Sequence, residues 1–476
     1  MGNKSFIKDF SWYFLGSFIP VVIGLIKTPI FTRHFDREAF GHLGLVTITF
    51  SYFGMVLFSW IASCIWRYYH KYDDAKNLKK LYSNLGFLLV VSITIVTMVS
   101  MIWYSTSENA LTKQLVFYSV FQLIFNQLFL CYMVVVRLQG RARFYTIVHS
   151  IKAIVAIAGA LVLVFIYNQN ISALILSLAV VDFLAIFILI LINPSDISLK
   201  VHLINKSTLR ELLIYGSAGL IINIGFLIIT SSDRYIIAWL TTIENVGVYD
   251  QVYKISQLSV WALVTIYFNT INPYLLNQLE KNFKQSDRLI RTYLQPFFLY
   301  GLPVIAYLSI FSIDIASILL GAEFREGYVI MPFIFIAAYL HGISNFYELR
   351  LKFANKLKRL TSIISVSVLL NVLITYFLVQ FYGYKSAAVT SVLIYLFMIM
   401  VFHYYDRQVA SFSRHDNILL LKIVSVIICQ IILFIVLKNS YQLEFFHKII
   451  LGLLFMASYF IIFRKYFLTL KIPVHD

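Results

Sequence analysis

Long apolar runs separated by short polar segments recur along the whole chain. Each run is about 20 residues or longer, which is enough for a helix to cross a hydrocarbon core of about 30 Å. The pattern predicts an all-α integral membrane protein with about 14 transmembrane helices. We expect them at 10–32, 40–66, 83–104, 113–136, 144–167, 171–192, 212–240, 246–272, 291–312, 327–349, 360–381, 385–405, 418–437 and 445–463.

Two of the predicted breaks between helices depend on very short polar segments. Asn168, Gln169 and Asn170 mark one break, and Gly383 marks the other. Asparagine and glycine favour turns because both tolerate backbone angles that other residues avoid. We therefore expect two helices, rather than one long helix, on each side of these positions.

Composition agrees with a membrane protein. Hydrophobic residues make up 60% of the chain and charged residues only 13%, whereas a soluble domain carries about 25% charged residues. The net charge of +17 would suggest a nucleic-acid partner in a soluble protein. In a membrane protein it indicates cytoplasmic loops rich in Lys and Arg, so no nucleic-acid partner is predicted. Cys64, Cys131 and Cys429 all lie in apolar runs and are interpreted as small core residues.

The positions of Lys and Arg predict the orientation. With the N-terminus inside, the predicted cytoplasmic segments hold 27 of the 39 Lys and Arg residues, and the outer segments hold 7. One missed helix would invert every later loop, so this bias supports the helix count. Both termini are therefore expected in the cytoplasm and the protein in an inner (cytoplasmic) membrane. The first helix lacks a signal-peptide cleavage site and is expected to remain.

The first and seventh predicted helices share an order of residues. The first contains Gly16-Ser17, Gly24, Thr32-Arg33 and Glu38-x-x-Gly41, and the seventh contains Gly216-Ser217, Gly225, Asp233-Arg234 and Glu244-x-x-Gly247. Six helices separate the copies, so both halves have one orientation, and we expect a pseudo-two-fold axis along the membrane normal. The predicted domains are an N-terminal lobe at 1–192, a cytoplasmic linker at 193–211, a C-terminal lobe at 212–405, and two final helices with a tail at 406–476.

Lys27 is a candidate binding residue because a charge within the membrane costs at least about 2.5–3.5 kcal/mol. It lies between Pro20 and Pro29, and its helix has no acidic residue after Asp9. Prolines predict a break or bend beside a cavity. The Lys27 ammonium is expected to face a phosphate or diphosphate there. The alternatives are that it reaches the outer interface or pairs with another helix.

Arg234 and Lys254 are two further charges within predicted helices. Adjacent helical residues point about 100° apart, so Asp233 is not expected simply to neutralise Arg234, which can clamp a phosphate. The alternative for Arg234 is an ion pair between helices. Lys254 follows Asp250 by four residues, which favours a local ion pair that could still line a cavity.

Lys152 and Asp182 lie on helices joined by a short turn, and we expect them to pair with each other. Arg67, Arg137 and Arg350 end helices on the predicted cytoplasmic side. They are interpreted as orientation signals that contact lipid headgroups. The alternative is a funnel that admits an anionic headgroup.

The sequence shows no pattern typical of an enzyme. The ten His residues have no metal-ligand spacing, and no Ser/His/Asp set or glycine-rich phosphate loop is present. No catalytic residue, metal or cofactor is therefore predicted. All outer segments are about 15 residues or shorter, which argues against a membrane polymerase or ligase that holds acceptor sugars.

Two runs of residues resemble the signatures of bacterial polysaccharide flippases, in the multidrug/oligosaccharidyl-lipid/polysaccharide exporter superfamily. The first is Lys27-Thr28-Pro29-Ile30-Phe31-Thr32-Arg33-His34-Phe35 with Glu38-Ala39-Phe40-Gly41. The second is Ser232-Asp233-Arg234-Tyr235-Ile236-Ile237-Ala238 with Val246-Gly247-Val248-Tyr249. The resemblance covers the whole chain in length, helix number and lobe order.

This resemblance implies two six-helix lobes around a cationic cavity, followed by two extra helices. It implies that an undecaprenyl-diphosphate-linked oligosaccharide is flipped from the cytoplasmic to the periplasmic leaflet by alternating access, for O-antigen or capsule synthesis. Lys27 and Arg234 match basic positions of the motifs, and Arg33 and Asp233 lie beside them. Lys152 and Lys254 are added from their burial alone. The implied partners are the lipid-linked glycan, membrane lipids and polysaccharide polymerase machinery.

Three alternatives remain open. A multidrug exporter of the same superfamily usually needs buried carboxylates for cationic drugs, and the first helix has none beyond its cytoplasmic end. A lipid II flippase would share the fold and the diphosphate chemistry. A membrane polymerase or ligase is the alternative from another class.

Overall fold

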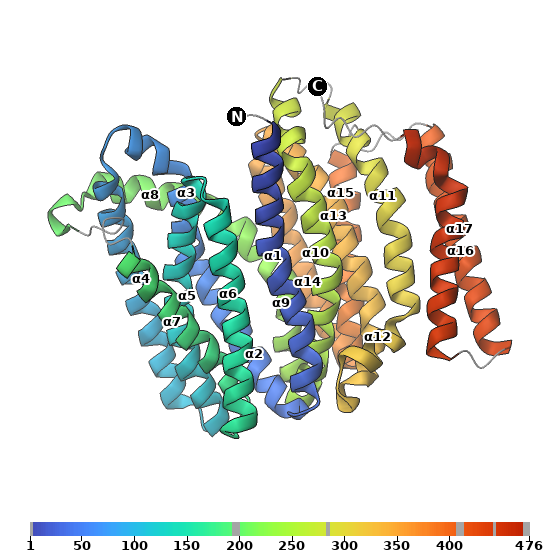
Figure 1. The fold of residues 1–476 in the computed structure, drawn as a ribbon, viewed down its shortest axis with the longest axis horizontal. Helices are drawn as coiled ribbons and strands as arrows, with labels where there is room; N and C mark the ends of the chain where they lie inside the picture. Colours follow the sequence, from blue (N-terminus) through green and yellow to red (C-terminus); the bar gives the residue numbers. More distant parts are fainter. Residues whose placement is uncertain (1–2, 193–199, 282–285, 406–413, 441–443, 470–476) are drawn as a thin grey trace. The chain divides into compact units, whose positions relative to one another are not determined.

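The structure is a computed structural model that describes residues 3–192, 200–281, 286–405, 414–440 and 444–469. These described residues form helices and connecting turns, with no β-strand among them. The chain divides into two compact units, residues 1–250 and 251–476. Each unit is described by itself (Figure 1).

The first unit contains nine α-helices and the start of a tenth within its described residues. They are α1 (Asn3–Thr32), α2 (Arg37–Phe53), α3 (Ser59–Asp74), α4 (Leu78–Thr106), α5 (Ala110–Leu138), α6 (Ala142–Leu161), α7 (Ala173–Ile192), α8 (Lys206–Ala218), α9 (Leu220–Leu240) and the beginning of α10 (Ile243–Lys281). Short π-helical turns at Gly54–Phe58 and Val162–Ile166 continue α2 and α6, and a 3-10 turn at Val201–Leu203 precedes α8.

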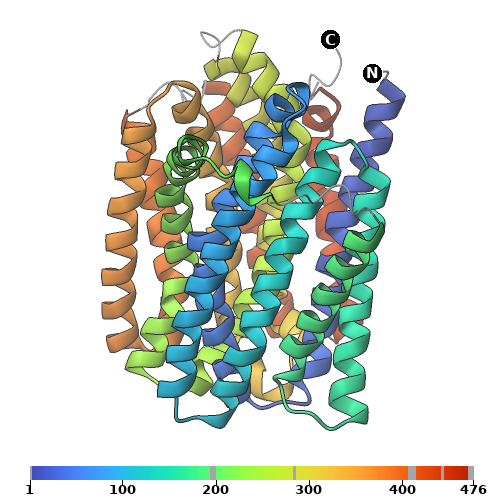
Figure 2. The same cartoon turned by 90° about the vertical axis from the view of Figure 1, so that its left-hand side faces the viewer.

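Helix α5 lies at the centre of the first unit, where it packs against α2, α3, α4, α6 and α7. Helix α1 packs along α6: the Thr146 hydroxyl donates to the Trp12 carbonyl at 2.6 Å, and Gly16 provides the room for this approach. A Cβ on Gly16 would lie 2.9 Å from the Thr146 Oγ1. The helices α4 to α7 run side by side along one direction (Figure 2), as membrane-spanning helices do.

The second unit continues α10 and adds seven α-helices within its described residues. They are α11 (Ser286–Ile310), α12 (Ser312–Leu319), α13 (Met331–Phe353), α14 (Leu357–Tyr382), α15 (Ala387–Tyr405), α16 (Arg414–Ser440) and α17 (Phe445–Thr469), with 3-10 turns at Ala322–Ile330 and Tyr384–Ser386. Helix α13 is the central element and packs against α11, α14 and α15. The last two helices attach to α11 through hydrogen bonds from Tyr307 to Gln430 and from Tyr459 to Leu299.

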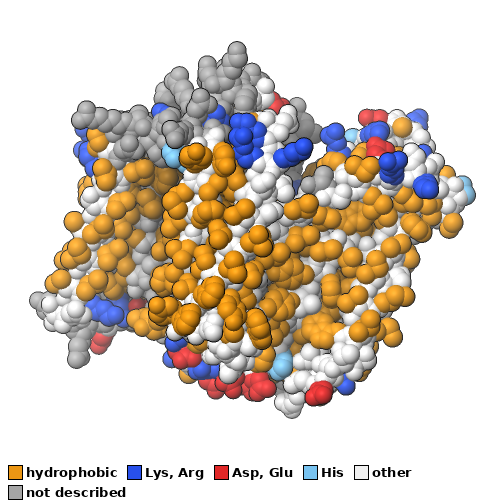
Figure 3. Space-filling view, turned by 180° about the vertical axis from the view of Figure 1, so that it is seen from behind, with side chains coloured by type: hydrophobic (Ala, Val, Ile, Leu, Met, Phe, Trp, Pro, Cys, Tyr) orange, Lys and Arg blue, Asp and Glu red, His pale blue; other side chains and the backbone are white. Residues whose placement is uncertain are grey.

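Twelve helical segments of the described residues are long and apolar enough to cross a membrane. Helix α1 contributes a shorter apolar stretch, Phe18–Thr32, and α10 is 39 residues long. Each of the predicted segments coincides with one of these helices, and the predicted fold class is confirmed. Hydrophobic side chains cover the flanks of the helices, while charged side chains gather near their ends (Figure 3).

Both of the short predicted breaks are confirmed. Asn168, with a φ of 51°, lies between the two helices of one pair, and Gly383, with a φ of 76°, lies between the helices of the other. Positive φ is the region that Gly and Asn tolerate best, so these residues end the helices for the reason that the sequence suggests.

Three local features differ from the prediction. The seventh predicted helix is divided at Gly219 into α8 and α9, and the second is interrupted by the π-helical turn. Helix α1 runs through Pro20 and Pro29 without the predicted break. The hydroxyls of Thr28 and Thr32 donate to the carbonyls of Gly24 and Thr28, one turn earlier, at 3.0 and 2.8 Å.

The two matching glycines of the repeated pattern, Gly41 and Gly247, meet in the first unit. A Cβ on Gly41 would lie 2.1 Å from the Ile243 carbonyl oxygen, and a Cβ on Gly247 would lie 2.0 Å from the Arg37 carbonyl oxygen. Each glycine thus contacts the residue four positions before the other glycine. Such reciprocal contacts are the mark of a two-fold relation, as the predicted pseudo-two-fold repeat requires.

Candidate functional site

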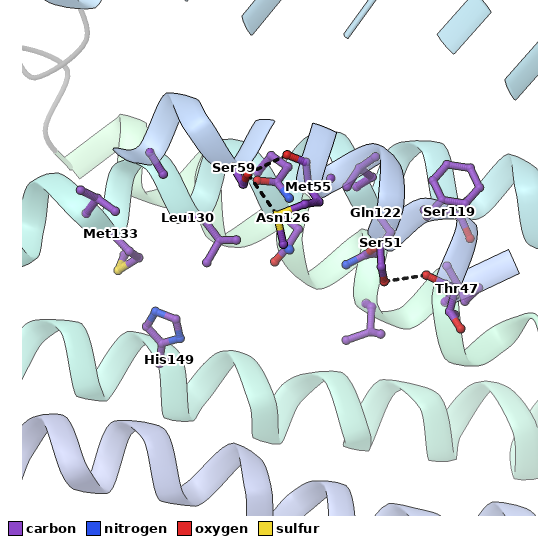
Figure 4. Close-up of a pocket in the computed structure, with 18 of the residues that line it drawn as sticks. Thr47, Ser51, Met55, Ser59, Ser119, Gln122, Asn126, Leu130, Met133 and His149 are labelled. Atoms are coloured by element: carbon purple, nitrogen blue, oxygen red, sulfur yellow. Dashed lines mark hydrogen bonds between the residues drawn. The ribbon is translucent and has the colours of Figure 1, made fainter. Parts of the chain in front are cut away.

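The first unit contains a half-open cavity of about 600 Å³ between α2, α3, α5, α6 and α7. Its lining is a mixture of neutral polar, aromatic and aliphatic side chains (Figure 4). The polar and aromatic members include Thr47, Ser51, Ser59, Trp66, Ser119, Gln122, Asn126, Gln127, Arg137, Tyr145 and His149.

One face of α5 forms a long wall of this cavity. Ser119, Gln122, Asn126, Met133 and Arg137 recur at intervals of three, four or seven residues, so their side chains lie on one side of the helix. Ser119 and Arg137 are 18 residues apart, which corresponds to about 27 Å along the axis. The wall therefore extends over most of the thickness of a bilayer core.

A second wall comes from α2, the π-helical turn and α3. Hydroxyl groups of this wall donate to their own helix, from Ser51 to Thr47 at 2.8 Å and from Ser59 to Met55 at 2.6 Å (Figure 4). These bonds satisfy the hydroxyl protons and leave oxygen lone pairs for a ligand. Gly54 lies where a Cβ would come within 3.2 Å of the Gln127 Nε2, so this glycine leaves room beside the Gln127 amide.

Aromatic rings surround the single arginine of the lining. The Arg137 guanidinium lies 5.4 Å from the Trp66 ring centroid and 6.0 Å from that of Tyr145. Tyr145 in turn lies 4.3 Å from the His149 ring, which projects from α6 toward Met133 of α5 (Figure 4). Arg137 is exposed. This end of the cavity therefore combines a cation with flat aromatic faces.

Two buried polar atoms of the cavity wall have no hydrogen-bond partner among the described residues. They are the Nε2 of His149 and the Oγ of Ser119. A buried polar group without a partner costs about 1–3 kcal/mol. Their position in the lining means that a bound molecule or water can satisfy them.

The predicted pair of Lys152 and Asp182 is confirmed, and it contacts two residues of the cavity lining. The Lys152 Nζ lies 2.5 Å from the Asp182 Oδ1 and donates to the Asn126 Oδ1 at 3.0 Å. The Gln122 amide donates to the other Asp182 oxygen at 3.3 Å. The pair therefore fixes two amide side chains whose helix lines the cavity.

Arg234 lies in a buried ionic cluster rather than in this lining. Its Nη1 donates to the Asp233 Oδ1 and to the Thr230 carbonyl, both at 2.7 Å, and its Nε lies 3.5 Å from the Asp250 Oδ1. The Tyr249 hydroxyl donates to the Asp233 Oδ2 at 2.6 Å. The guanidinium and both carboxylates are almost fully buried.

This cluster corrects one expectation. Asp233 does partner Arg234, because the long arginine side chain turns back along its own helix to reach the adjacent carboxylate. Asp250 also contacts Arg234 and so connects α9 to α10. The arrangement seen is the inter-helix ion pair that the sequence left open as the alternative.

The remaining predicted residues lie elsewhere. Lys27 is half-buried on α1, Arg33 is exposed just after the end of α1, and Lys254 is half-buried on α10. None of the six predicted binding residues belongs to the described lining of the cavity. Among the described residues, no group of His, Cys, Asp or Glu is placed to hold a metal ion. Cys64 and Cys131 are buried as expected, whereas Cys429 is exposed on α16.

Five lining residues were not predicted from the sequence: Gln122, Asn126, Gln127, Tyr145 and His149. Neutral amides within apolar helices carry no signal comparable to that of a buried charge. The useful signal was the spacing of Ser119, Gln122 and Asn126, three or four residues apart, which places polar groups on one face of a single helix. Arg137 is interpreted from the sequence as an orientation signal, with a funnel for an anionic headgroup as the alternative.

Comparison with known proteins gives one family and one fold. A family model described as "Polysaccharide biosynthesis protein" matches residues 6–278. No curated protein sequence gives a significant match. The structure is similar to the lipid II flippase MurJ in an inward closed conformation, with a TM-score of 0.75 and 14% identity over 96% of this chain and 99% of MurJ.

Multidrug transporters share the fold at a greater distance. An inward-facing multidrug resistance MATE family transporter of the MOP superfamily gives a TM-score of 0.59, with 11% identity over 86% of this chain and 96% of that chain. A mutant form of the Vibrio cholerae MATE transporter VcmN gives 0.54, with 14% identity over 85% and 98%. The chain thus has the fold of these membrane transporters.

Proposed function

Because the chain belongs to the polysaccharide biosynthesis protein family, whose model matches more than half of it, we propose that it is a flippase for an undecaprenyl-diphosphate-linked oligosaccharide. It moves this molecule from the cytoplasmic to the periplasmic leaflet of the bacterial inner membrane. The observation that carries the proposal is the cavity of about 600 Å³ in the first unit.

The chemistry of the lining suits a sugar. Sugar hydroxyls both donate and accept hydrogen bonds, and the side-chain amides of Gln122, Asn126 and Gln127 offer both functions. The faces of Trp66 and Tyr145 provide flat apolar surfaces for sugar rings. The volume falls in the range of about 300–1,000 Å³ typical of ligand sites.

Charge in the lining favours an anionic substrate over a cationic drug. Arg137 is a permanent cation at one end of the cavity, and the described lining contains no Asp or Glu. Asp182 lies close by, but its carboxylate is paired with Lys152. A diphosphate at Arg137 would place the attached sugars along the wall of amides.

Alternating access supplies the movement in this proposal. The Gly41–Gly247 contact lies at the start of α2 and α10, on the predicted periplasmic side, and in this proposal it closes that side. Opening to the periplasm requires these helix ends to separate. Lys27, Arg33 and Lys254 are proposed to contact the headgroup at other stages of the cycle, and Arg234 and Asp233 to do so after the buried cluster opens.

Exchange of Arg137 tests the proposal in cells. Arg137→Gln should reduce export of surface polysaccharide at least about tenfold, since a charge-assisted contact to a phosphate is worth about 1.5–3 kcal/mol. Arg141→Gln is the matched control, because Arg141 is also exposed, lies on the same predicted side and is outside the described lining. Undecaprenyl-linked repeat units should accumulate in the Arg137→Gln cells.

Equal polysaccharide export by the Arg137→Gln and Arg141→Gln variants would contradict the assignment of the cavity as the substrate site. A lipid II flippase remains the alternative because it handles the same diphosphate chemistry. If deletion stopped cell growth and left surface polysaccharide precursors at their normal level, lipid II would be the substrate instead.

A further inference from the structure

The second unit contains a groove of about 830 Å³ that the proposed transport does not use. It lies between the first turns of α14 and the last turns of α15, and it includes the turn that joins α13 to α14. Its mouth is basic and its floor is apolar. These two regions match the charged headgroup and the apolar acyl chain of a phospholipid.

Three exposed cations form the mouth of the groove: Lys356, Lys358 and Arg359. Within the described residues, none of them makes an ion pair. The Arg359 guanidinium lies 5.0 Å from the ring centroid of Tyr405 on α15, which holds it at the edge of the groove. No side chain caps the start of α14, so its first amide groups add further positive potential.

Apolar side chains continue from the mouth between the two helices. Ile363 and Val366 of α14 lie on one side of the helix, with Val366 about half exposed, and Phe397 and Val401 of α15 form the facing side. The members of each pair are three or four residues apart, so each side of the floor extends about one helical turn. Exposed apolar groups in a continuous groove below a basic mouth are suited to an acyl chain.

We propose that this groove is a binding site for an anionic phospholipid of the bilayer. The phosphate contacts Lys356, Lys358 and Arg359, and one acyl chain lies between α14 and α15. The mouth is on the predicted cytoplasmic side, where basic clusters at helix ends attract anionic lipids. The groove belongs to the second unit, whereas the cavity proposed to bind the transported sugar belongs to the first. The lipid proposal therefore does not depend on the identity of the transported substrate.

Lipid binding to the purified full-length protein tests this site. Native mass spectrometry should show phosphatidylglycerol bound at least about tenfold more tightly than phosphatidylcholine. The triple variant Lys356→Gln, Lys358→Gln, Arg359→Gln should lose this preference. The matched control is Lys79→Gln, Arg141→Gln, Lys206→Gln, which removes the same number of Lys and Arg from exposed positions on the predicted cytoplasmic side and should keep it.

Two further measurements identify which part of the lipid is recognised. Val366→Trp fills the floor without changing the charge, and it should weaken phosphatidylglycerol binding by a similar factor. Inorganic phosphate should not compete. The proposal would be overturned by equal binding to the two triple variants, by full binding to Val366→Trp, or by displacement of the lipid with inorganic phosphate or undecaprenyl diphosphate.

Discussion

Gly41 and Gly247 lie backbone to backbone where α2 and α10 begin: a Cβ on Gly247 would be 3.0 Å from the Gly41 amide nitrogen. The two glycines occupy equivalent places in the repeated Glu-x-x-Gly pattern. They are therefore small for the same reason, because each forms half of a self-complementary contact. In the proposed cycle this contact closes the periplasmic side.

A methyl group at Gly247 should keep the first turns of α2 and α10 apart. In Gly247→Ala the added Cβ would overlap the Arg37 carbonyl oxygen, and overpacking of this kind costs about 1–3 kcal/mol. We expect export to fall and a cysteine introduced at Ile243 to react faster with a membrane-impermeant maleimide. The matched control is Gly219→Ala, whose Cβ would meet only the Asn223 amide at 4.0 Å. Equal maleimide labelling in the Gly247→Ala and Gly219→Ala proteins would show that the Gly41–Gly247 contact does not close the periplasmic side.

The Lys152–Asp182 pair should behave as a buried ion pair. Lys152→Ala leaves a carboxylate that is 1% exposed without its cation, which costs about 3–5 kcal/mol. The double variant Lys152→Met, Asp182→Leu should recover most of that stability because no unpaired charge remains. Unfolding in mild detergent measures both. If the double variant were as unstable as Lys152→Ala, the loss would come from packing rather than from charge.

We expect the loss of Arg234 to lower the stability of the folded protein, apart from any effect on transport. Arg234→Gln removes the guanidinium that contacts the buried Asp233 and Asp250 carboxylates, with a loss of stability again of about 3–5 kcal/mol. Arg234→Lys should not restore it, since one ammonium cannot replace contacts made by both Nη1 and Nε. Thermal unfolding of the purified variants provides the measurement. A purified Arg234→Gln variant of normal stability would contradict this role of Arg234 in folding.

Much of the fold could be predicted because the bilayer restricts what a chain can do. Hydropathy located every long helix, since spanning segments must be apolar and satisfy their own backbone. Asn168 and Gly383 revealed the two shortest turns because both have positive φ. The Lys152–Asp182 pair followed from the cost of an isolated charge in the membrane.

The cavity of the first unit could not be predicted in the same way. Gln122 and Asn126 are neutral, so they neither disturb the hydropathy of α5 nor require a partner as a charge does. The direction of the Arg234 side chain was also beyond the sequence, because a long side chain can point to a cavity or back to Asp233 with the same helix position. Gly219 and the π-helical turn interrupt regular α-helix without changing hydropathy.

Transport by the purified protein tests the central claim most directly. Liposomes would contain the protein and an undecaprenyl-diphosphate-linked oligosaccharide with a label on the sugar, and a membrane-impermeant reagent would destroy the label on the outer leaflet. The account predicts that wild-type and Arg141→Gln proteins expose nearly all of the label, whereas Arg137→Gln proteins expose little beyond the outer-leaflet share. Label that stays protected with folded wild-type protein, at the level of protein-free liposomes, would contradict it.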